Sequence, residues 1–153
     1  MEAYGVSTSS DGPLAWSHAQ KRLAGARNYW IATTRPDGRP HAAPVWGVWV
    51  EGGLYFGTGR SSVKGLNLAH SPELVVHLES ADDVVILEGE VEEVRDQTLF
   101  DAVDAAYRAK YGMGVSEAGD EGAVWYVVRP RKAHAWLEND FPNTATRWRF
   151  HVG

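Results

Sequence analysis

The sequence predicts a mainly β protein, a barrel of six to eight antiparallel strands with a few short helices. Short runs rich in β-branched and aromatic residues follow one another through tight turns, which is typical of antiparallel sheets. Strands do not alternate with long helices, and this argues against a doubly wound parallel sheet. A barrel is favoured because closing a sheet on itself removes its exposed edges.

The first part of the chain predicts one helix and a three-stranded meander. Residues 1–13 are small and polar and predict a flexible arm, which precedes a single domain over 14–153. Apolar residues recur at helical spacing within 14–26. Pro36-Asp37-Gly38 and Glu51-Gly52-Gly53 have the composition of tight turns between strands. The strands expected around these turns cover residues 28–35, 41–50 and 54–58.

The second part predicts two more helices and the strands that complete the barrel. A helix over 62–70 ends where Ser71-Pro72 disfavours helical backbone. Asp96 is placed to cap a second helix over 97–111, and the glycine-rich segment 112–122 is a candidate lid. The remaining expected strands cover residues 74–79, 84–94, 124–130, 132–138 and 146–152.

Composition narrows the class of protein. A chain of 153 residues has the size of one domain, and its net charge of −5 argues against a large nucleic-acid-binding surface. Cysteine is absent, so disulfides and thiolate chemistry are excluded. No apolar run reaches the length of about 20 residues that spans a membrane, and the N-terminus lacks a signal-peptide pattern. We expect a cytoplasmic protein with neither a nucleic-acid nor a membrane partner.

Common catalytic and metal signatures are absent from the sequence. It contains no H-E-x-x-H and no G-x-S-x-G, and its six histidines show no metal-ligand spacing. Gly57-Thr58-Gly59 lacks the third glycine of a dinucleotide fingerprint. We therefore expect no metal site, and no side chain is identified as a catalytic acid or base.

One segment, GTGRSSVKGLNL at 57–68, concentrates hydrogen-bond donors where a strand gives way to a helix. Thr58 and Ser62 offer hydroxyls, Arg60 and Lys64 offer positive charge, and the helix start offers backbone amides. A phosphate group prefers this combination. The same residues are also compatible with an ordinary helix cap next to solvated basic side chains.

The run over 30–79 and the ending DFPNTATRWRF (140–150) resemble the split β-barrel flavin and deazaflavin oxidoreductases. This superfamily includes pyridoxamine 5'-phosphate oxidase, and the likeness is to its actinobacterial, F420-dependent reductase branch. The resemblance rests on the order of a strand, the sequence P-D-G-R-P, a second strand, a turn and a third strand. The pattern T-x-x-x-S-x-K-x-x-N-L then follows. The resemblance implies a split barrel and a homodimer with the cofactor site at the subunit interface. It also implies that Ser62 and Lys64 hold the cofactor phosphate and that four residues border its ring: Pro44, Val45, Trp46 and Thr58.

Departures from the family pattern bear on the cofactor. Positions that carry basic residues in the oxidases are Ala42, Gly47 and Val63 here, and only Arg60 could partly replace them. Each such charge-assisted contact is worth roughly 1.5–3 kcal/mol. A lightly charged groove suits coenzyme F420, whose phosphate is part of a long tail, better than FMN.

The leading hypothesis is an F420-dependent oxidoreductase that transfers a hydride between the coenzyme and a small planar conjugated substrate. Arg147 and Trp148, together with Trp46, are candidate walls of its pocket, although Trp148 equally suits the barrel core. One alternative is an FMN-binding oxidase or reductase. Another is a non-enzymatic flavin- or haem-binding protein, whose haem ligand would be one of three histidines: His41, His70 or His77.

Overall fold

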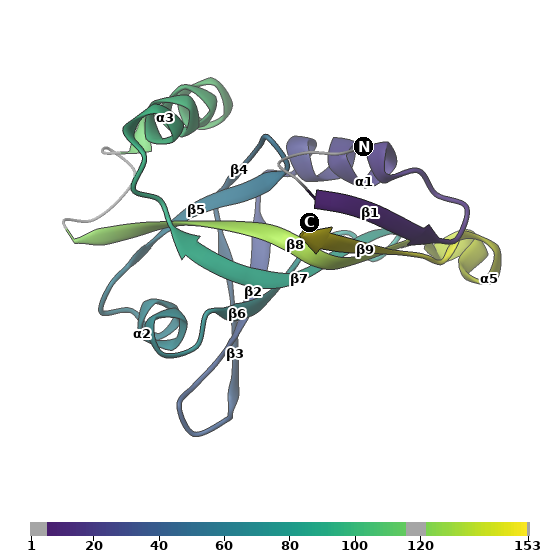
Figure 1. Ribbon diagram of the computed structural model, residues 1–153, viewed down its shortest axis with the longest axis horizontal. Coiled ribbons are helices and arrows are strands. Elements are labelled where there is room, and N and C mark those ends of the chain that lie inside the picture. Colours follow the sequence, from purple (N-terminus) through teal and green to yellow (C-terminus); the bar gives the residue numbers. More distant parts are fainter. Residues whose placement is uncertain (1–5, 116–121, 153) are drawn as a thin grey trace.

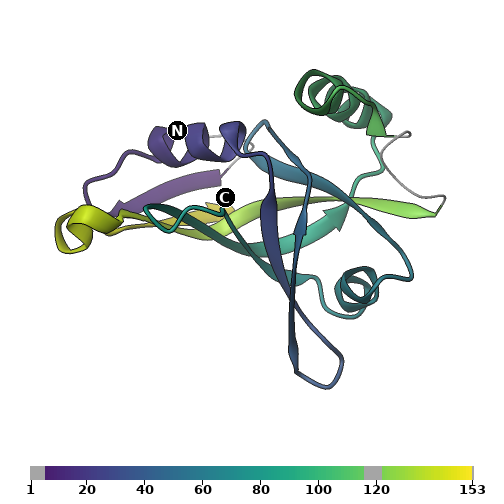
Figure 2. The same cartoon turned by 180° about the vertical axis from the view of Figure 1, so that it is seen from behind.

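The computed structural model describes residues 6–115 and 122–152, which form one antiparallel sheet and several short helices (Figures 1 and 2). The strands are β1 (Val6–Asp11), β2 (Tyr29–Thr34), β3 (Pro40–Val45), β4 (Val48–Val50), β5 (Gly53–Gly59), β6 (Glu73–His77), β7 (Asp83–Glu93), β8 (Ala123–Leu137) and β9 (Thr146–Val152). The helices are α1 (Trp16–Gly25), α2 (Val63–His70), α3 (Gln97–Tyr111), η1 (Glu138–Asp140) and α5 (Phe141–Thr144).

The sheet closes into a barrel, as the sequence predicts. The pairing runs from β3 through β2, β6, β7 and β8 to β5 and β4. Because β3 and β4 are consecutive in the chain, the last strand of this series joins the first. The long strand β8 pairs through its first half with β5, and through its second half with β9, which lies outside the ring.

The expected strand over 41–50 is divided in two. Trp46 and Gly47 separate β3 from β4, so the two halves pair with different neighbours. The backbone is crowded at this break: a Cβ on Gly47 would lie 3.0 Å from the carbonyl oxygen of Tyr55 and 3.3 Å from the ring of Tyr29. The break therefore needs glycine for the close approach of other segments.

The two strands expected at 124–130 and 132–138 are a single strand, β8. Pro130 pairs with Gly89 and Lys132 pairs with Glu88, which leaves Arg131 unpaired in a β-bulge. The bulge absorbs a proline that would otherwise interrupt the ladder. The expectation of two strands is wrong because the bulge lets one strand continue through Pro130.

Part of the expected N-terminal arm is also a strand. Residues 6–11 form β1 and pair with β9 from Val6↔Val152 to Asp11↔Arg147. The expectation of a flexible segment is thus wrong for these residues, whose pairing partner lies at the far end of the chain. The rest of that expectation, over 1–5, falls outside the described residues.

Two apolar clusters stabilise the fold. The larger one fills the barrel, and Trp16 of α1 packs edge-on against its Trp148 with ring centroids 5.2 Å apart. The smaller one lies between α3 and the outside of β4, β5 and β8, and includes Val103 and Tyr107. Figure 1 shows α3 standing apart from the barrel on this side.

Both longer helices expected after residue 60 are confirmed. The structure places α3 over the expected range, with Asp96 Oδ1 accepting hydrogen bonds from Thr98 N and Leu99 N. The helices η1 and α5 were not expected. They are three and four residues long, which is too short for a helical repeat of apolar residues to show in the sequence. Within the described ranges, no helix has the length and apolar character needed to cross a membrane.

Candidate cofactor site

The turn between β5 and α2 is organised by the hydroxyl of Ser62. This hydroxyl donates to the carbonyl of Gly59 over 2.7 Å and accepts from the amide of Gly65 over 3.1 Å. The hydroxyl of Thr58 lies 3.1 Å from it. Ser62 is therefore the N-cap of α2, which accounts for part of the donor-rich sequence by ordinary helix capping.

Close packing of this turn depends on Gly65. A Cβ at this position would overlap the carbonyl oxygen of Gly59 and lie 3.1 Å from that of Arg60. Two residues after Gly65, the side chain of Asn67 donates to Thr33 Oγ1 of β2 over 3.0 Å, and both side chains are buried. These contacts fix α2 against the barrel and so fix the direction in which its first turn points.

The first turn of α2 leaves donors available. The amides of Val63 and Lys64 have no acceptor within the helix, because they precede its first internal hydrogen bond. Lys64 is half-buried and forms no hydrogen bond or ion pair with the residues that the structure describes. Free amides, the positive end of the helix dipole and one cation together make a site suited to an anion.

Arg60 is directed to another partner. Its guanidinium donates to Glu93 over 2.9 Å, and Arg95 occupies the second oxygen of that carboxylate at 2.7 Å. Arg60 is also largely exposed, so this ion pair contributes little to stability. Arg60 and Arg95 share this one carboxylate, so Glu93 offsets their charge only in part, whereas Lys64 forms no ion pair with the described residues.

Two of the three positions that lack family charges are exposed, and the third, Gly47, is buried in the break between β3 and β4. Ala42 is exposed on β3, and Val63 is 46% exposed at the start of α2. On the inner side of β3, His41 stands opposite Thr33, and its Nδ1 is buried without a partner among the described residues. A buried polar atom without a hydrogen bond is costly, so a ligand that accepts or donates there would be favoured.

Of the four residues expected along the cofactor ring, the three that precede Gly47 have three different surroundings. Pro44 is exposed and pairs with Trp30, whereas Val45 is buried in the barrel core. The ring of Trp46 stacks on Tyr111 of α3, with centroids 4.4 Å apart and planes inclined by 3°. Trp46 therefore packs against α3 and does not present an open wall on that side.

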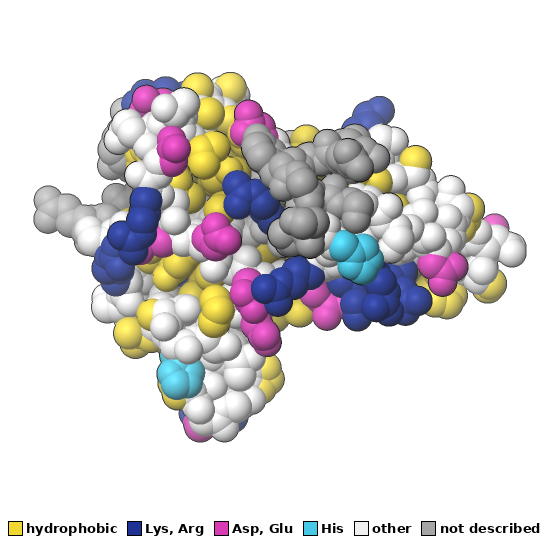
Figure 3. Space-filling model, in the orientation of Figure 1, with side chains coloured by type: hydrophobic (Ala, Val, Ile, Leu, Met, Phe, Trp, Pro, Cys, Tyr) yellow, Lys and Arg dark blue, Asp and Glu magenta, His cyan; other side chains and the backbone are white. Residues whose placement is uncertain are grey.

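Arg147 and Trp148 are not brought to the α2 turn within one chain. Trp148 is 1% exposed in the barrel core, which corrects its expectation as a pocket wall in favour of core packing. Arg147 pairs with His134 of β8, ten positions beyond the Val124 that pairs with Thr58. This separation is roughly 30 Å along an extended strand. Figure 3 shows Lys and Arg side chains gathered beside β9.

The comparison with known families decides what kind of protein this is. The sequence matches the family of pyridoxamine 5'-phosphate oxidase over residues 16–137. The chain belongs to the pyridoxamine 5'-phosphate oxidase family. Its split-barrel fold is the one that the sequence resemblance implied. No protein of curated function matches the sequence.

Solved structures share this family's fold. An F420 reductase is 26% identical, with a TM-score of 0.58 over 74% of this chain and 94% of that one. A heme binding protein from Mycobacterium smegmatis is 22% identical, with a TM-score of 0.67 over 80% of this chain and 54% of that one. This chain thus spans about half of its length. A FAD-binding protein from Mesorhizobium loti is 17% identical, with a TM-score of 0.62 over 94% and 97%.

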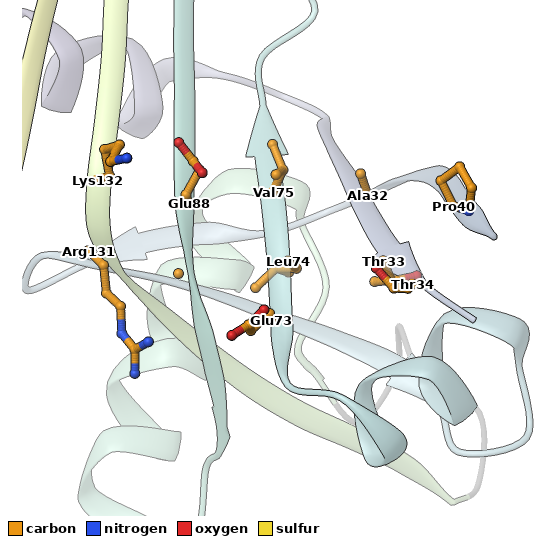
Figure 4. Close-up of a pocket in the computed structure, with 11 residues that line it drawn as sticks. Ala32, Thr33, Thr34, Pro40, Glu73, Leu74, Val75, Glu88, Arg131 and Lys132 are labelled. Carbon is orange, nitrogen blue, oxygen red and sulfur yellow. The ribbon is translucent and has the colours of Figure 1, made fainter. Parts of the chain in front are cut away.

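The structure of this family member also contains a hollow that the sequence did not indicate. A cavity of about 440 Å³ lies on the outer side of the sheet, with Thr34, Glu88 and Lys132 among its walls (Figure 4). It borders the β-bulge at Arg131, and the bulge is a long-range feature that local sequence does not reveal. Another hollow, of about 530 Å³, lies between α1 and the β6–β7 turn.

Other expected residues have ordinary surroundings or lie outside the description. His77 stacks parallel to Trp30 and its Nδ1 lies 2.9 Å from the carbonyl of Leu78, while His70 is exposed at the end of α2. Within 6–115 and 122–152, no group of three or more His, Asp or Glu could hold a metal ion. Of the candidate lid at 112–122, residues 116–121 fall outside the described residues.

Replacing Gly65 tests the packing of the α2 turn. We expect Gly65→Ala to lower the free energy of unfolding by about 1–3 kcal/mol, because the added methyl must displace the backbone of Gly59. Gly25→Ala, at the end of α1, has nothing within 4 Å of the added atom and should be neutral or slightly stabilising. Urea unfolding measures both variants, and equal stabilities would contradict the crowding.

The buried amine of Lys110 leads us to expect that the free energy of unfolding rises with pH in the alkaline range. Burial, with Arg27 as the lesser cause, lowers the pKa of Lys110 from 10.5 to about 8. The unfolded chain then holds this proton more tightly, so the contribution of Lys110 to the free energy of unfolding increases as the pH rises from about 8 to 10.5. Burial raises the pKa of Tyr29, so above its ordinary value of 10.0 this tyrosine acts in the opposite direction.

The measurement therefore uses urea unfolding at several pH values between about 8 and 9.5, where tyrosine ionisation is small. We expect the slope of stability against pH to flatten in Lys110→Met and to persist in Lys21→Met, which replaces an exposed lysine on α1. An unchanged slope in Lys110→Met would assign the rise to other groups.

Proposed function

We propose that the protein is an F420-dependent oxidoreductase that transfers a hydride between the deazaflavin coenzyme and a small planar conjugated substrate. The observation that supports this proposal is the first turn of α2, where backbone amides without a helix acceptor lie beside Lys64, which forms no ion pair with the described residues. Membership of the family and the likeness to an F420 reductase support the choice of a flavin-type cofactor.

The charge at this turn favours the deazaflavin over FMN. Three positions with basic side chains in the oxidases are uncharged here, and Arg60 is paired with Glu93, a carboxylate that it shares with Arg95. A terminal phosphate carries more charge than a phosphate within a tail, and it needs more cations to offset its desolvation. One lysine and the amides of a helix N-terminus suit the less charged group.

The chain would hold the cofactor from both ends. Ser62 keeps the α2 turn in shape through its cap, and Lys64 with the adjacent amides would bind the phosphate. The exposed side of Pro44 and the backbone up to Trp46 would support the ring. The deazaflavin, when bound, supplies the hydride chemistry, and the protein contributes orientation and exclusion of water.

A second copy of the chain would complete the site. The outer sheet face presents the stacked rings of Trp30 and His77, with Pro44 and Ile86 beside them in register. Leu66 of α2 is 57% exposed next to the anion site. Exposed apolar groups that adjoin a ligand site are typical of surfaces covered by a partner. A homodimer with the cofactor groove at its interface fits this distribution.

Binding titrations with purified protein test the cofactor. We expect F420 to bind more tightly than FMN, and Lys64→Ala to weaken F420 binding about tenfold or more, because a charge-assisted contact is lost. Lys21→Ala, an exposed lysine on α1, is the matched control and should bind like the wild type.

Tighter binding of FMN would favour the flavin alternative and reject F420. A Soret band on titration with haem, lost in His41→Ala, would favour a haem-binding protein, as in the structural relative from Mycobacterium smegmatis. Equal affinities of Lys64→Ala and wild type for F420 would show that Lys64 does not bind the phosphate.

Sedimentation tests the proposed assembly. We expect the wild type to sediment with twice the mass of one chain, and Ile86→Lys to shift it toward the monomer because a charge is placed on the apolar face. Ala24→Lys on the exposed side of α1 should leave the mass unchanged. A monomeric wild type would refute the homodimer.

A further inference from the structure

The backbone of Gly47 is held by side chains of α3. Its amide donates to the hydroxyl of Tyr111 over 3.0 Å, and its carbonyl lies 2.9 Å from both that hydroxyl and Lys110 Nζ. In an unbroken strand a neighbouring strand would satisfy these groups. At the break between β3 and β4, two side chains from 63 and 64 residues away replace that pairing. We call Lys110, Tyr111 and their bonds to Gly47 the polar clamp.

The surroundings of Lys110 hold its amine in place. Its Nζ donates to the hydroxyl of Tyr29 over 2.8 Å and lies 4.7 Å from the centre of the Tyr29 ring and 5.2 Å from that of Tyr111. Tyr107 packs on Tyr111 from the same helix, and the guanidinium of Arg27 lies over Trp46 and Tyr111. The amine is thus enclosed by groups from β2, α3 and the segment before β2.

Attachment of α3 does not account for this arrangement by itself. Val103 and Tyr107 already bury the apolar face of the helix against the barrel. The clamp instead concentrates two polar side chains on one glycine. That glycine directly follows Trp46, whose ring stacks on the clamp residue Tyr111. A shift of the clamp would therefore act on Trp46 and on the end of β3.

We propose that Lys110 and Tyr111 are positioning residues that set the end of β3 and the following Trp46 for the ring of the bound cofactor, acting through the backbone of Gly47. This inference rests on the proposed function, because the ring is assigned to that strand there. Neither residue contacts the cofactor in this arrangement. Their effect is on the orientation of the ring and on its affinity, and the phosphate end at Lys64 is left unchanged.

Two conservative variants test the inference in the full-length protein. Tyr111→Phe keeps the stack on Trp46 and removes the hydroxyl, and Lys110→Met keeps the length of the side chain and removes its donor. Lys21→Met is the matched control on α1. For each we would measure amide exchange of peptides spanning 46–48 without cofactor, thermal unfolding, cofactor affinity, and the visible absorption band of the bound cofactor.

We expect faster exchange at 46–48 and about 3- to 10-fold weaker binding in both clamp variants. Lys110→Met loses one hydrogen bond to the carbonyl of Gly47, and Tyr111→Phe loses the hydroxyl that contacts both its amide and its carbonyl. The band of the bound ring should shift toward that of free cofactor, which a loss of global stability alone would not cause in a folded sample. Combining Tyr111→Phe with Lys64→Ala should multiply the two losses, because the ring and phosphate ends are separate.

Wild-type affinity and band position in both variants would overturn the inference, even with faster exchange. Unchanged exchange would overturn the clamp itself. If Lys110→Met does not fold, Tyr111→Phe decides alone. Failure of the wild type to bind either F420 or FMN would refute the proposed function and this inference with it, whereas a binding wild type with unaffected variants would refute this inference alone.

Discussion

Barrel closure depends on the two-residue break between β3 and β4. At this point the chain stops pairing with β2 and starts pairing with β5, and the ring of strands is completed. Gly47 suits this turn because a Cβ there would lie only 3.0 Å from the carbonyl oxygen of Tyr55, so a side chain would require its neighbours to shift. The polar groups freed by the break are satisfied by α3, so a helix outside the barrel stabilises its closure. The position of Trp46 and the course of the proposed ring-binding strand both follow from this break.

Features that depend on neighbouring residues could be predicted from the sequence. The cap of α3 by Asp96 and the cap of α2 by Ser62 involve donors within three residues of the cap. Features that depend on distant residues could not. The break at Gly47 is set by Tyr55 across a hairpin, the continuity of β8 through Pro130 is set by the bulge opposite Gly89, and the pairing of β1 is set by the other end of the chain.

In the candidate site, too, contacts between neighbouring residues could be predicted and contacts between distant residues could not. Its donors lie within seven residues, so the sequence could place Thr58, Ser62 and Lys64 at one turn. The sequence could not show that Arg60 pairs with Glu93, which lies 33 positions away. Nor could it show that Trp46 is covered by a tyrosine from α3. With Arg60 engaged elsewhere, recognition at this turn would rest on oriented backbone amides more than on side-chain charge, which favours geometry over net attraction.

The pairing of β1 with β9 has a consequence for the order in which the chain assembles. Val6 meets Val152, so this ladder joins residues about as far apart in sequence as the chain allows. Contacts of such separation form late, because the intervening chain must be ordered first. During synthesis, β1 emerges long before its partner and waits as an unpaired strand. Meanwhile the second half of β8 exposes the edge that β9 will cover, and such an edge is open to pairing with other chains. By covering this edge of β8, β9 protects the sheet from pairing with other chains.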